Sequence, residues 1–451
     1  MKSIMDRLDR LTERGLEPGT RKYDGIDDLA GHRFHLRVDG EGKGVLMVDA
    51  SRLLFLNGTA LDMVHAILSG MDARSAARYM KRRYRRLKRT RALEDYGRVK
   101  ELLARFVEGE ADAVPQVGSP AGAIGADDLP APYRMDLALT YRCQNECAHC
   151  YNEPKREVEE MPKERWLQVI DRLWSLGIPH VVFTGGEPTM VPFLEDLVRA
   201  SEGNGQITGL ISNGRRLAEP GYLKGLVEVG LDHVQITLLS HRMSVHDELV
   251  CSEGAWKETV EGIKAALEED LYVSTNTTIM SENLDDVELT VKFLVGLGVK
   301  NVSVNGLIRS GKGREARSVT YDDLKDLLTR LVALTEEAGV KLVWYTPTPY
   351  CELNPLTYGL GIKQCTACSL AMAVEPDGGV LPCQSYYQPL GNILDDGWDG
   401  IWDAELCKRI RGRGYLPENC AECHLRDVCG GGCPLSLEHG DYVCLDRHSS
   451  M

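Results

Sequence analysis

Residues 140–154 read TYRCQNECAHCYNEP and hold three cysteines, Cys143, Cys147 and Cys150, within eight residues. The spacing is three residues and then two, and no fourth cysteine lies close by. Structural zinc sites take four protein ligands and are usually built from CxxC pairs, so here zinc would need a distant fourth ligand. Three thiolates on a four-iron cluster instead leave one iron open to a small molecule.

The chain around this triplet has a regular strand-then-helix rhythm. Six units of this kind predict a parallel sheet in an α/β fold, curled as a partial (β/α)6 TIM-like barrel. In such folds the active site lies at the carboxyl ends of the strands, where the cysteine triplet follows the first one. The predicted strands are 135–140, 181–184, 209–212, 234–239, 273–279 and 301–307, and the helices that follow them are 161–176, 193–201, 217–229, 256–270, 285–296 and 321–338.

Two other regions flank the predicted barrel, which we place at residues 132–345. Residues 1–108 are predicted to form a small winged-helix-like α+β module, and residues 109–131, rich in Gly, Ala, Pro and acids, a linker. Residues 346–451 are predicted to form a cysteine-rich iron–sulfur domain whose metals substitute for a large core. Within the first module we expect strands at 34–38, 45–48 and 53–57 and helices at 59–70, 73–89 and 92–107.

The composition limits the function classes. A net charge of −14 argues against nucleic-acid binding. No apolar run approaches the roughly 20 residues of a membrane-spanning helix, and the start, MKSIMDRLDRLTERG, is predicted to be a charged helix rather than a signal core, so we expect a cytoplasmic protein. None of the fourteen cysteines precedes Cys143 and ten lie from Cys351 onward, which in a reducing compartment predicts metal binding rather than disulfides.

The triplet, followed by Tyr151, resembles the signature of the radical S-adenosylmethionine (SAM) superfamily. The resemblance implies that Cys143, Cys147 and Cys150 hold a [4Fe–4S] cluster whose open iron chelates SAM. Reduction would then cleave SAM to methionine and a 5′-deoxyadenosyl radical. It also implies SAM contacts after the second, third and fourth strands, at Gly185, Gly186, Glu187 and Pro188, at Ser212 and Asn213, and at Thr237.

The GGEP segment suits such a role because glycine lets a ligand approach the backbone and Glu187 can accept from an ammonium group, although GGEP alone is also an ordinary turn. After the fourth strand the chain departs from its subgroup, which often reads S-L-D-G and carries an arginine–glycine pair. The SAM carboxylate and ribose therefore lack an assigned partner, for which Arg309 is a candidate. The subgroup's H-D pair is matched by His246 and Asp247, which fit a role as capping or loop residues equally well.

The C-terminal cysteines form a second constellation. Two CxxC pairs fit zinc knuckles or iron–sulfur sites, but the full order resembles the SPASM domain and implies two auxiliary [4Fe–4S] clusters, hence three in total. Cys251, Cys351 and Cys407 are left over, with Cys407 predicted to be structural and Cys351 an alternative ligand, a thiol near the substrate or an ordinary thiol. The resemblance assigns Cys365, Cys368, Cys383 and Cys433 to one cluster and Cys420, Cys423, Cys429 and Cys444 to the other.

The first module resembles PqqD-like peptide-recognition elements, which bind the leader of a precursor peptide as an extra strand. Its basic run KRRYRRLKRTR (81–91) is either a solvated helix face or a patch that attracts an acidic leader.

Together these resemblances imply a maturase that builds thioether or carbon–carbon cross-links in a ribosomally made precursor peptide, with flavodoxin or ferredoxin as electron donor. The alternatives are an enzyme acting on a small molecule or tetrapyrrole, a sulfatase-maturing oxidase, and a non-catalytic zinc or electron-carrier protein. The sequence assigns no residue as the group that deprotonates the substrate.

Overall fold

The structure of the protein, a computed structural model, describes residues 15–38, 42–49, 52–84, 86–107, 129–152 and 158–439. Two compact units divide the chain, one with Met1–Asp128 and Trp174–Pro179 and the other with Leu129–Leu173 and His180–Met451. The predicted N-terminal helix and linker lie almost entirely outside the described residues. The predicted domain boundaries remain predictions.

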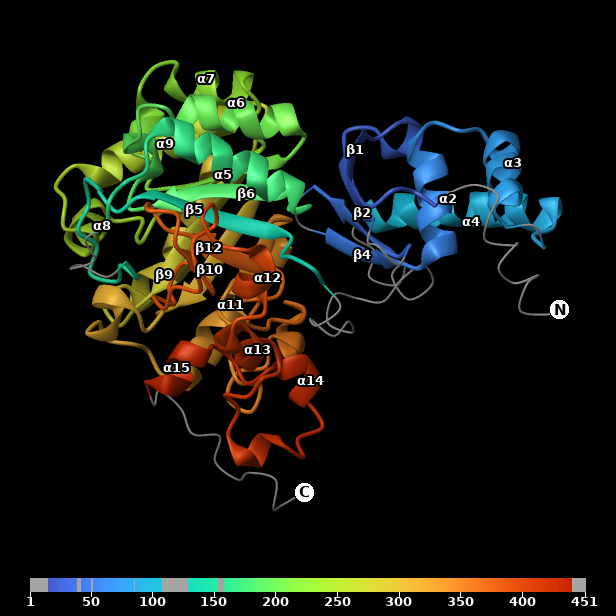
Figure 1. Cartoon of the computed structure of the whole chain (residues 1–451). Helices are drawn as coiled ribbons and strands as arrows, with labels where there is room; N and C mark the ends of the chain where they lie inside the picture. The colour runs from blue at the N-terminus through green and yellow to red at the C-terminus, as the bar shows by residue number, and fades with distance from the viewer. Residues whose placement is uncertain are drawn as a thin grey trace. The chain divides into compact units, whose positions relative to one another are not determined.

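The first unit is a four-stranded antiparallel sheet followed by three helices, shown in blue in Figure 1. Its strands β2, β3 and β4 and its three helices lie where the sequence predicts them. Strand β1 was missed, because GTRKYD has no apolar alternation, and α3 ends at Arg83 rather than at residue 89. The elements are β1 (Gly19–Asp24), β2 (Arg33–Val38), β3 (Gly44–Val48), β4 (Arg52–Leu56), α2 (Gly58–Leu68), α3 (Ala73–Arg83) and α4 (Arg89–Val107), and the strand order is β1-β2-β3-β4.

A buried carboxylate explains why α3 ends there. Asp62 of α2 is 1% exposed and accepts hydrogen bonds from Arg83 Nε at 2.7 Å and from the Tyr84 hydroxyl at 2.6 Å. These contacts pull the end of α3 onto α2, because a buried carboxylate needs hydrogen-bond partners. Part of the basic run therefore serves the core of the module.

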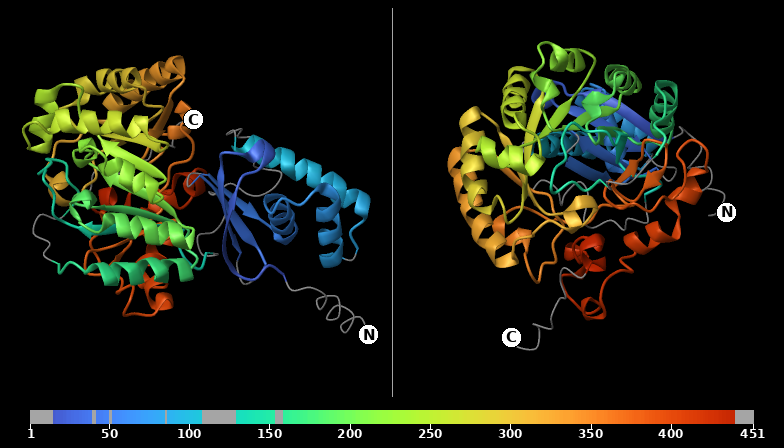
Figure 2. Two further views of the ribbon diagram at one scale, coloured as in Figure 1. Left: turned by 90° about the horizontal axis from the view of Figure 1, so that it is seen from above. Right: turned by 90° about the vertical axis from the view of Figure 1, so that its left-hand side faces the viewer.

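The second unit contains a nine-stranded sheet with the order β11-β10-β9-β8-β7-β6-β5-β12-β13. Strands β5 to β11 are parallel to their neighbours, and each of β5 to β10 is followed by a helix that lies outside the curved sheet (Figure 1 and Figure 2). The predicted partial (β/α)6 barrel is confirmed. Its elements are β5 (Arg134–Thr140), α5 (Lys163–Ser175), β6 (His180–Gly185), α6 (Leu194–Asn204), β7 (Ile207–Ser212), α7 (Tyr222–Glu228), β8 (His233–Thr237), α8 (Met243–Val250), α9 (Ala255–Glu268), β9 (Tyr272–Ile279), α10 (Val287–Leu297), β10 (Asn301–Gly306), α11 (Tyr321–Ala338) and β11 (Lys341–Trp344).

The cysteine-rich region continues this sheet. Strand β12 (Ala371–Val374) pairs parallel with β5, and β13 (Val380–Leu381) pairs antiparallel with β12. The strand that precedes the cysteine triplet therefore has a strand of the cysteine-rich region as its direct neighbour. Short helices complete the region at α12 (Trp398–Trp402), α13 (Glu405–Arg411), α14 (Arg426–Cys429) and α15 (Pro434–Glu438).

Burial alternates along β8, whereas β5, β6 and β10 are buried almost throughout. In β8, Val234 and Ile236 are fully buried, whereas the alternate residues, Thr237 among them, are partly exposed. Thr237 pairs in register with Asn276 of β9, which pairs with Ser303 of β10. Because paired residues of neighbouring parallel strands share a face, these three polar side chains lie in one row. In the parts of the chain that are described, no helix is long and apolar enough to cross a membrane.

Candidate functional site

The cysteine triplet lies in the loop that follows β5. The thiols of Cys143, Cys147 and Cys150 are close enough to interact electrostatically, and burial raises the pKa of Cys143 to about 11 and the pKa of the other two above its usual value. Free thiols here are therefore protonated, and a bound metal would have to displace the protons. The structure brings the three predicted ligands together.

Two elements hold this loop in place. The amides of Glu146 and Ala148 donate to the last carbonyls of α8, Val250 at 3.0 Å and Leu249 at 2.9 Å. From the loop after β10, Lys312 Nζ donates to the carbonyl of Glu146 at 3.1 Å. The amides of the cysteine loop thus satisfy the last carbonyls of α8. The sequence did not predict this helix.

The GGEP segment packs directly against the start of the loop. A Cβ on Gly185, whose φ is +131°, would lie 2.2 Å from the carbonyl oxygen of Thr140, and one on Gly186 would lie 2.3 Å from that of Arg142. The Gly186 amide donates to Thr140 at 2.6 Å. Both glycines are thus required by the contact with the cysteine loop, whether or not a ligand also approaches them. Pro188 begins a short 3-10 helix (Pro188–Met190).

Glu187 is fully buried and joins the second and third strands of the barrel. Its carboxylate accepts hydrogen bonds from the Ser212 hydroxyl at 2.9 Å, from the Asn213 amide at 2.8 Å, and from the amide and hydroxyl of Thr189 at 3.1 and 2.7 Å. Desolvation raises the pKa of this carboxyl. Oε2 receives only the Asn213 amide among these donors, so it has acceptor capacity for one more group.

Asn213 links this network to the cysteines. Its side-chain amide lies 3.9 Å from Cys143 Sγ, which also accepts from the Asn145 amide at 3.4 Å. Ser212 and Asn213 were predicted as SAM contacts, and the structure places both beside Glu187 and the first cysteine. Thr237 is partly exposed at the carboxyl end of β8, with Asn276 as its neighbour in register.

Two residues near the site escaped prediction. Arg215 donates to Asn145 Oδ1 at 2.7 Å and to Ser252 Oγ at 2.8 Å, which ties the cysteine loop to the segment after α8. It directly follows the ISNG motif, and that position was the available signal. Asn276 contributes a buried side-chain oxygen that has no hydrogen-bond partner among the described residues.

The other polar candidates serve the fold. Asp247 accepts from the amides of Gly254 at 2.8 Å and Trp256 at 2.7 Å and so caps α9, and His246 Nδ1 accepts from the Leu239 amide at 3.2 Å. Arg309 binds its own loop through the Ala316 carbonyl at 3.0 Å and the Ser318 hydroxyl at 2.8 Å.

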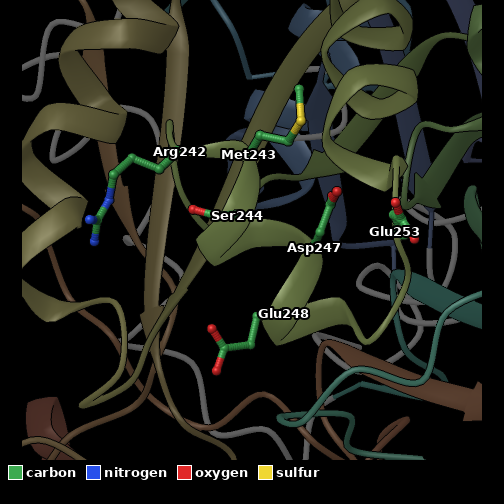
Figure 3. A pocket seen from close by; sticks show the side chains of 6 residues that line it. All are labelled: Arg242, Met243, Ser244, Asp247, Glu248 and Glu253. Atoms are coloured by element: carbon green, nitrogen blue, oxygen red, sulfur yellow. The ribbon is translucent and has the colours of Figure 1, made fainter.

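An open depression of about 700 Å³ lies along α8 (Figure 3). Asp247 is occupied by capping, and Arg242 pairs with Asp286 at 2.8 Å. Two of the polar residues that line the depression are therefore engaged in contacts that hold the fold. The depression is lined by Arg242, Met243, Ser244, Asp247, Glu248 and Glu253.

In the cysteine-rich region, Cys365, Cys383 and Cys433 form a second group of thiols that interact with one another. Burial raises the pKa of Cys383 to about 12 and the pKa of the other two as well. Cys429 Sγ accepts from the amides of Tyr350 at 3.2 Å and Gly431 at 3.4 Å. Cys420 and Cys423 lie in the turn around residues 418–423, and Cys444 lies outside the described residues.

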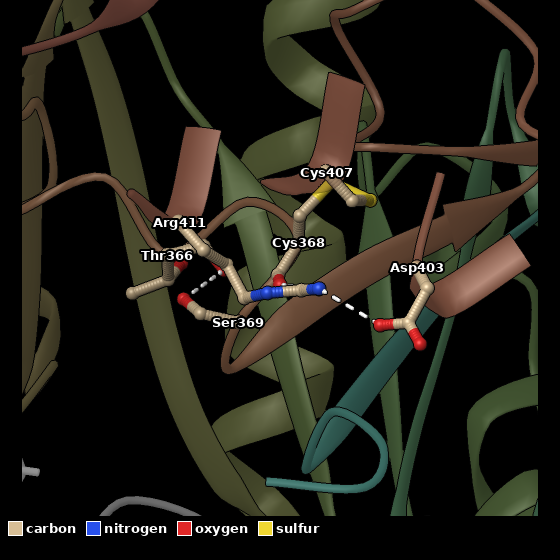
Figure 4. The surroundings of a disulfide bond; sticks show 6 residues. All are labelled: Thr366, Cys368, Ser369, Asp403, Cys407 and Arg411. Atoms are coloured by element: carbon tan, nitrogen blue, oxygen red, sulfur yellow. Dashed lines mark hydrogen bonds and ion pairs between the residues drawn. A yellow bond between two sulfur atoms is a disulfide. The ribbon is translucent and has the colours of Figure 1, made fainter. Parts of the chain in front are cut away.

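The fourth predicted ligand of this group is Cys368, and its role as a ligand remains a prediction. Its sulfur is bonded to Cys407 of α13 in a disulfide with a Cα–Cα distance of 5.2 Å (Figure 4), contrary to the expectation of no disulfides. Both cysteines are fully buried, and Arg411 donates to the Cys368 carbonyl at 3.1 Å.

The donor sets fit iron–sulfur clusters. Among residues 15–439, where described, no three His, Cys, Asp or Glu side chains surround the position of a single metal ion. In a four-iron cluster each thiolate binds a different iron, so the thiols stand further apart, and thiolate is the ligand that such clusters use.

Family models match the chain at these two groups of cysteines. Residues 137–294 match the radical SAM superfamily, and residues 365–424 match SPASM, an iron–sulfur cluster-binding domain. This is a radical SAM/SPASM enzyme. Bound SAM and its cluster supply a 5′-deoxyadenosyl radical in such enzymes, and Cys143, Cys147 and Cys150 are the residues here that would hold them.

Curated relatives of the radical SAM/SPASM enzyme include PqqA peptide cyclases. That of Ruegeria pomeroyi is 27% identical over 318 residues, covering 68% of this chain and 83% of the relative. That of Bradyrhizobium diazoefficiens is 29% identical over 323 residues, with the same coverage.

Solved structures share its fold. Streptococcus suis SuiB bound to S-adenosylmethionine has a TM-score of 0.67 and 16% identity over 89% of this chain and 95% of that one. SuiB bound to its precursor peptide SuiA has a TM-score of 0.65 and 16% identity over 92% of this chain and 96% of that one.

Proposed function

We propose that this enzyme is a peptide maturase that cleaves SAM and oxidatively cross-links a ribosomally made precursor peptide. The observation that carries the proposal is the combination, in one chain, of a radical SAM cysteine loop with a separate sheet-and-helix unit whose outer strands, β1 and β4, each pair with only one described strand. The relatives named peptide cyclases and the likeness to SuiB, solved with a precursor peptide, support the same direction.

The chemistry is balanced without an added oxidant. One-electron reduction of SAM would give methionine and the adenosyl radical, and hydrogen abstraction by that radical would give 5′-deoxyadenosine and leave a radical on the peptide. Bond formation, either thioether or carbon–carbon, then releases one proton and one electron, and an auxiliary cluster held by the C-terminal cysteines would accept the electron. The peptide loses two hydrogens in total. The electron that starts the reaction comes from flavodoxin or ferredoxin in the cytoplasm.

The SAM-binding residues are assigned from the site. Glu187 Oε2 accepts from the SAM ammonium group, because that oxygen has capacity left beside the Asn213 amide. Gly185, Gly186 and Pro188 shape the backbone next to this oxygen. Ser212 and Asn213 hold the Glu187 carboxylate in place. Thr237 faces the polar side of the sheet and contacts the ribose.

Two auxiliary clusters bring the total to three. Cys365, Cys383 and Cys433 hold the first, for which Cys368, bonded to Cys407 in this structure, is the fourth predicted ligand. The second set comprises Cys420, Cys423, Cys429 and Cys444.

The first unit binds the leader of the precursor. A free strand edge offers backbone hydrogen bonds to an extended peptide. Lys81 and Arg82 are exposed at the end of α3, whereas Arg83 is turned inward to Asp62, so the outward cations attract an acidic leader.

The test uses the short peptide encoded beside this protein. Anaerobically reconstituted enzyme, reductant, SAM and the peptide are combined, and 5′-deoxyadenosine and peptide mass are measured. We expect both 5′-deoxyadenosine and a peptide that has lost two hydrogens, and neither from a variant in which Cys143, Cys147 and Cys150 are alanine. SAM cleavage with an unmodified, unbound peptide would point to a small-molecule substrate instead.

A further inference from the structure

We infer that Tyr151 and Tyr387 couple the SAM-binding cysteine loop to the auxiliary cysteine set around Cys383, so that SAM binding at one alters the properties of the other. The inference rests on the proposed function, because it assumes that both cysteine sets hold clusters. It assigns the two tyrosines as positioning residues that act through the cysteine loops beside them.

The first link joins the residues that follow two cluster cysteines. Tyr151 follows Cys150, Gln384 follows Cys383, and the Tyr151 hydroxyl donates to Gln384 Oε1 at 3.0 Å. One hydrogen bond thus connects the backbone neighbours of two proposed ligands that are 233 residues apart in the chain.

A second link runs in the opposite direction. The Tyr387 hydroxyl, from the auxiliary loop, donates to Asn152 Oδ1 at 2.9 Å, next to Tyr151. Asn152 in turn donates to the carbonyl of Gly185 at 2.9 Å. Tyr387 therefore connects the auxiliary loop both to the cysteine loop and to the segment that packs under it.

Three further contacts make this junction rigid. The Tyr141 ring meets the Tyr387 ring edge-on with centroids 6.3 Å apart, and its hydroxyl donates to Glu375 at 2.7 Å. Ser310 donates to the Ser385 carbonyl at 2.8 Å, and both residues are buried. Packed, hydrogen-bonded contacts of this kind transmit small displacements because they do not deform continuously.

The phenols remain neutral donors at this junction. Burial raises the pKa of both Tyr151 and Tyr387 above its ordinary value, and the thiol of Cys150 contributes to the shift in each case.

Two nearby tyrosines provide a matched control. Tyr386 donates to Glu438 at 2.8 Å and Tyr415 donates to the Gly430 carbonyl at 2.7 Å, so both hydroxyls are bonded within the cysteine-rich region. The double variant Y386F/Y415F therefore removes two partly buried hydroxyl bonds without cutting the junction. The double variant Y151F/Y387F removes the two that cross it.

The test is a redox titration of the reconstituted holoenzyme monitored by electron paramagnetic resonance, with and without SAM. In the wild type and in Y386F/Y415F we expect SAM to shift the midpoint potential or line shape of the auxiliary signal. In Y151F/Y387F we expect SAM to bind with unchanged affinity while this response is lost. The single variant Y151F serves the same comparison if the double variant fails to hold iron, and a partial response is then expected.

The inference would be overturned if SAM still shifted the auxiliary signal in both Y151F/Y387F and Y151F. It would also be overturned if SAM did not change the auxiliary signal of the wild type. Failure of the proposed function looks different. In that case no 5′-deoxyadenosine forms, or the peptide is unchanged, whatever the state of the tyrosines.

Discussion

Ser212 donates its hydroxyl hydrogen to the buried carboxylate of Glu187 at 2.9 Å, and this contact fastens the third strand of the barrel to the GGEP segment after the second. The same carboxylate takes the Asn213 amide at 2.8 Å, and the Asn213 side chain reaches toward Cys143. Glu187 therefore organises the cysteine site even before any ligand is bound.

The substitution Glu187→Gln is expected to weaken SAM binding about tenfold, or ~1.4 kcal/mol. The amide NH2 of glutamine would face donors, leaving at least one unsatisfied at about 1–3 kcal/mol. Calorimetric titration of SAM and thermal unfolding check both effects. The matched variant Glu195→Gln changes an exposed carboxylate paired with Arg199 and should affect neither. Wild-type SAM affinity in E187Q would contradict the assignment.

The pairing of Cys368 with Cys407 predicts that Cys368→Ser and Cys407→Ser behave alike. Each should keep the full iron content and lose stability by about 2–4 kcal/mol, the usual range for a disulfide. Cys365→Ser should instead lose about four irons, one cluster. Iron and thiol assays on purified, reconstituted protein check this. If C368S lost iron and C407S did not, Cys368 would be a ligand after all.

Much of the barrel was readable from periodicity. The runs VVFT (181–184) and VQITLL (234–239) both contribute to strands at the predicted places, β6 and β8. Helix α8 was missed because its eight residues are too short for a period to stand out.

Long-range contacts within the site were not readable. Cys368 and Cys407 are separated by 39 residues, and their pairing depends on where α13 packs. The resemblance assigns Cys368 to a cluster with Cys365, whereas in the structure its sulfur is bonded to that of Cys407. Similarly, nothing local relates Tyr151 to Gln384, since their loops are brought together by tertiary contacts such as the pairing of β12 with β5.

The histidine pair of buried His180 and partly exposed His233 predicts acid sensitivity. Their Nε2 atoms are 2.8 Å apart, and burial lowers the pKa of His233 from 6.5 to about 3. The unfolded chain binds this proton below pH 6.5 and the folded chain does not, so stability is present above pH 6.5 and falls as the pH drops toward 3. At pH 5, protonation of this group in the unfolded chain should lower the free energy of unfolding by about 2 kcal/mol relative to neutral pH.

Urea unfolding at pH 7 and pH 5 checks the effect of His233. The substitution His233→Gln keeps a polar side chain but cannot be protonated, so it should reduce the difference between the two pH values. His439→Gln, at an exposed position, should leave the difference as in the wild type. Equal pH dependence in H233Q and the wild type would rule out this pair as the source.

The exposed cations at the end of α3 predict salt-dependent binding of an acidic leader peptide. Replacing Lys81 and Arg82 with glutamine should weaken binding to the full-length enzyme by roughly 0.2–1 kcal/mol per charge, the range of exposed ion pairs. Fluorescence anisotropy with labelled peptide at low and high salt measures this, and added salt should narrow the gap between variant and wild type because it screens the charges.

The control for Lys81 and Arg82 removes two exposed cations from the barrel helices instead. Lys264 and Lys292 pair only with neighbours on their own helices, Glu261 at 2.8 Å and Glu288 at 2.7 Å, so K264Q/K292Q changes the net charge by the same amount away from the module. Leader binding should be unaffected in this variant. If both double variants weakened binding equally, the attraction would come from overall charge and the basic run would be an ordinary solvated helix face.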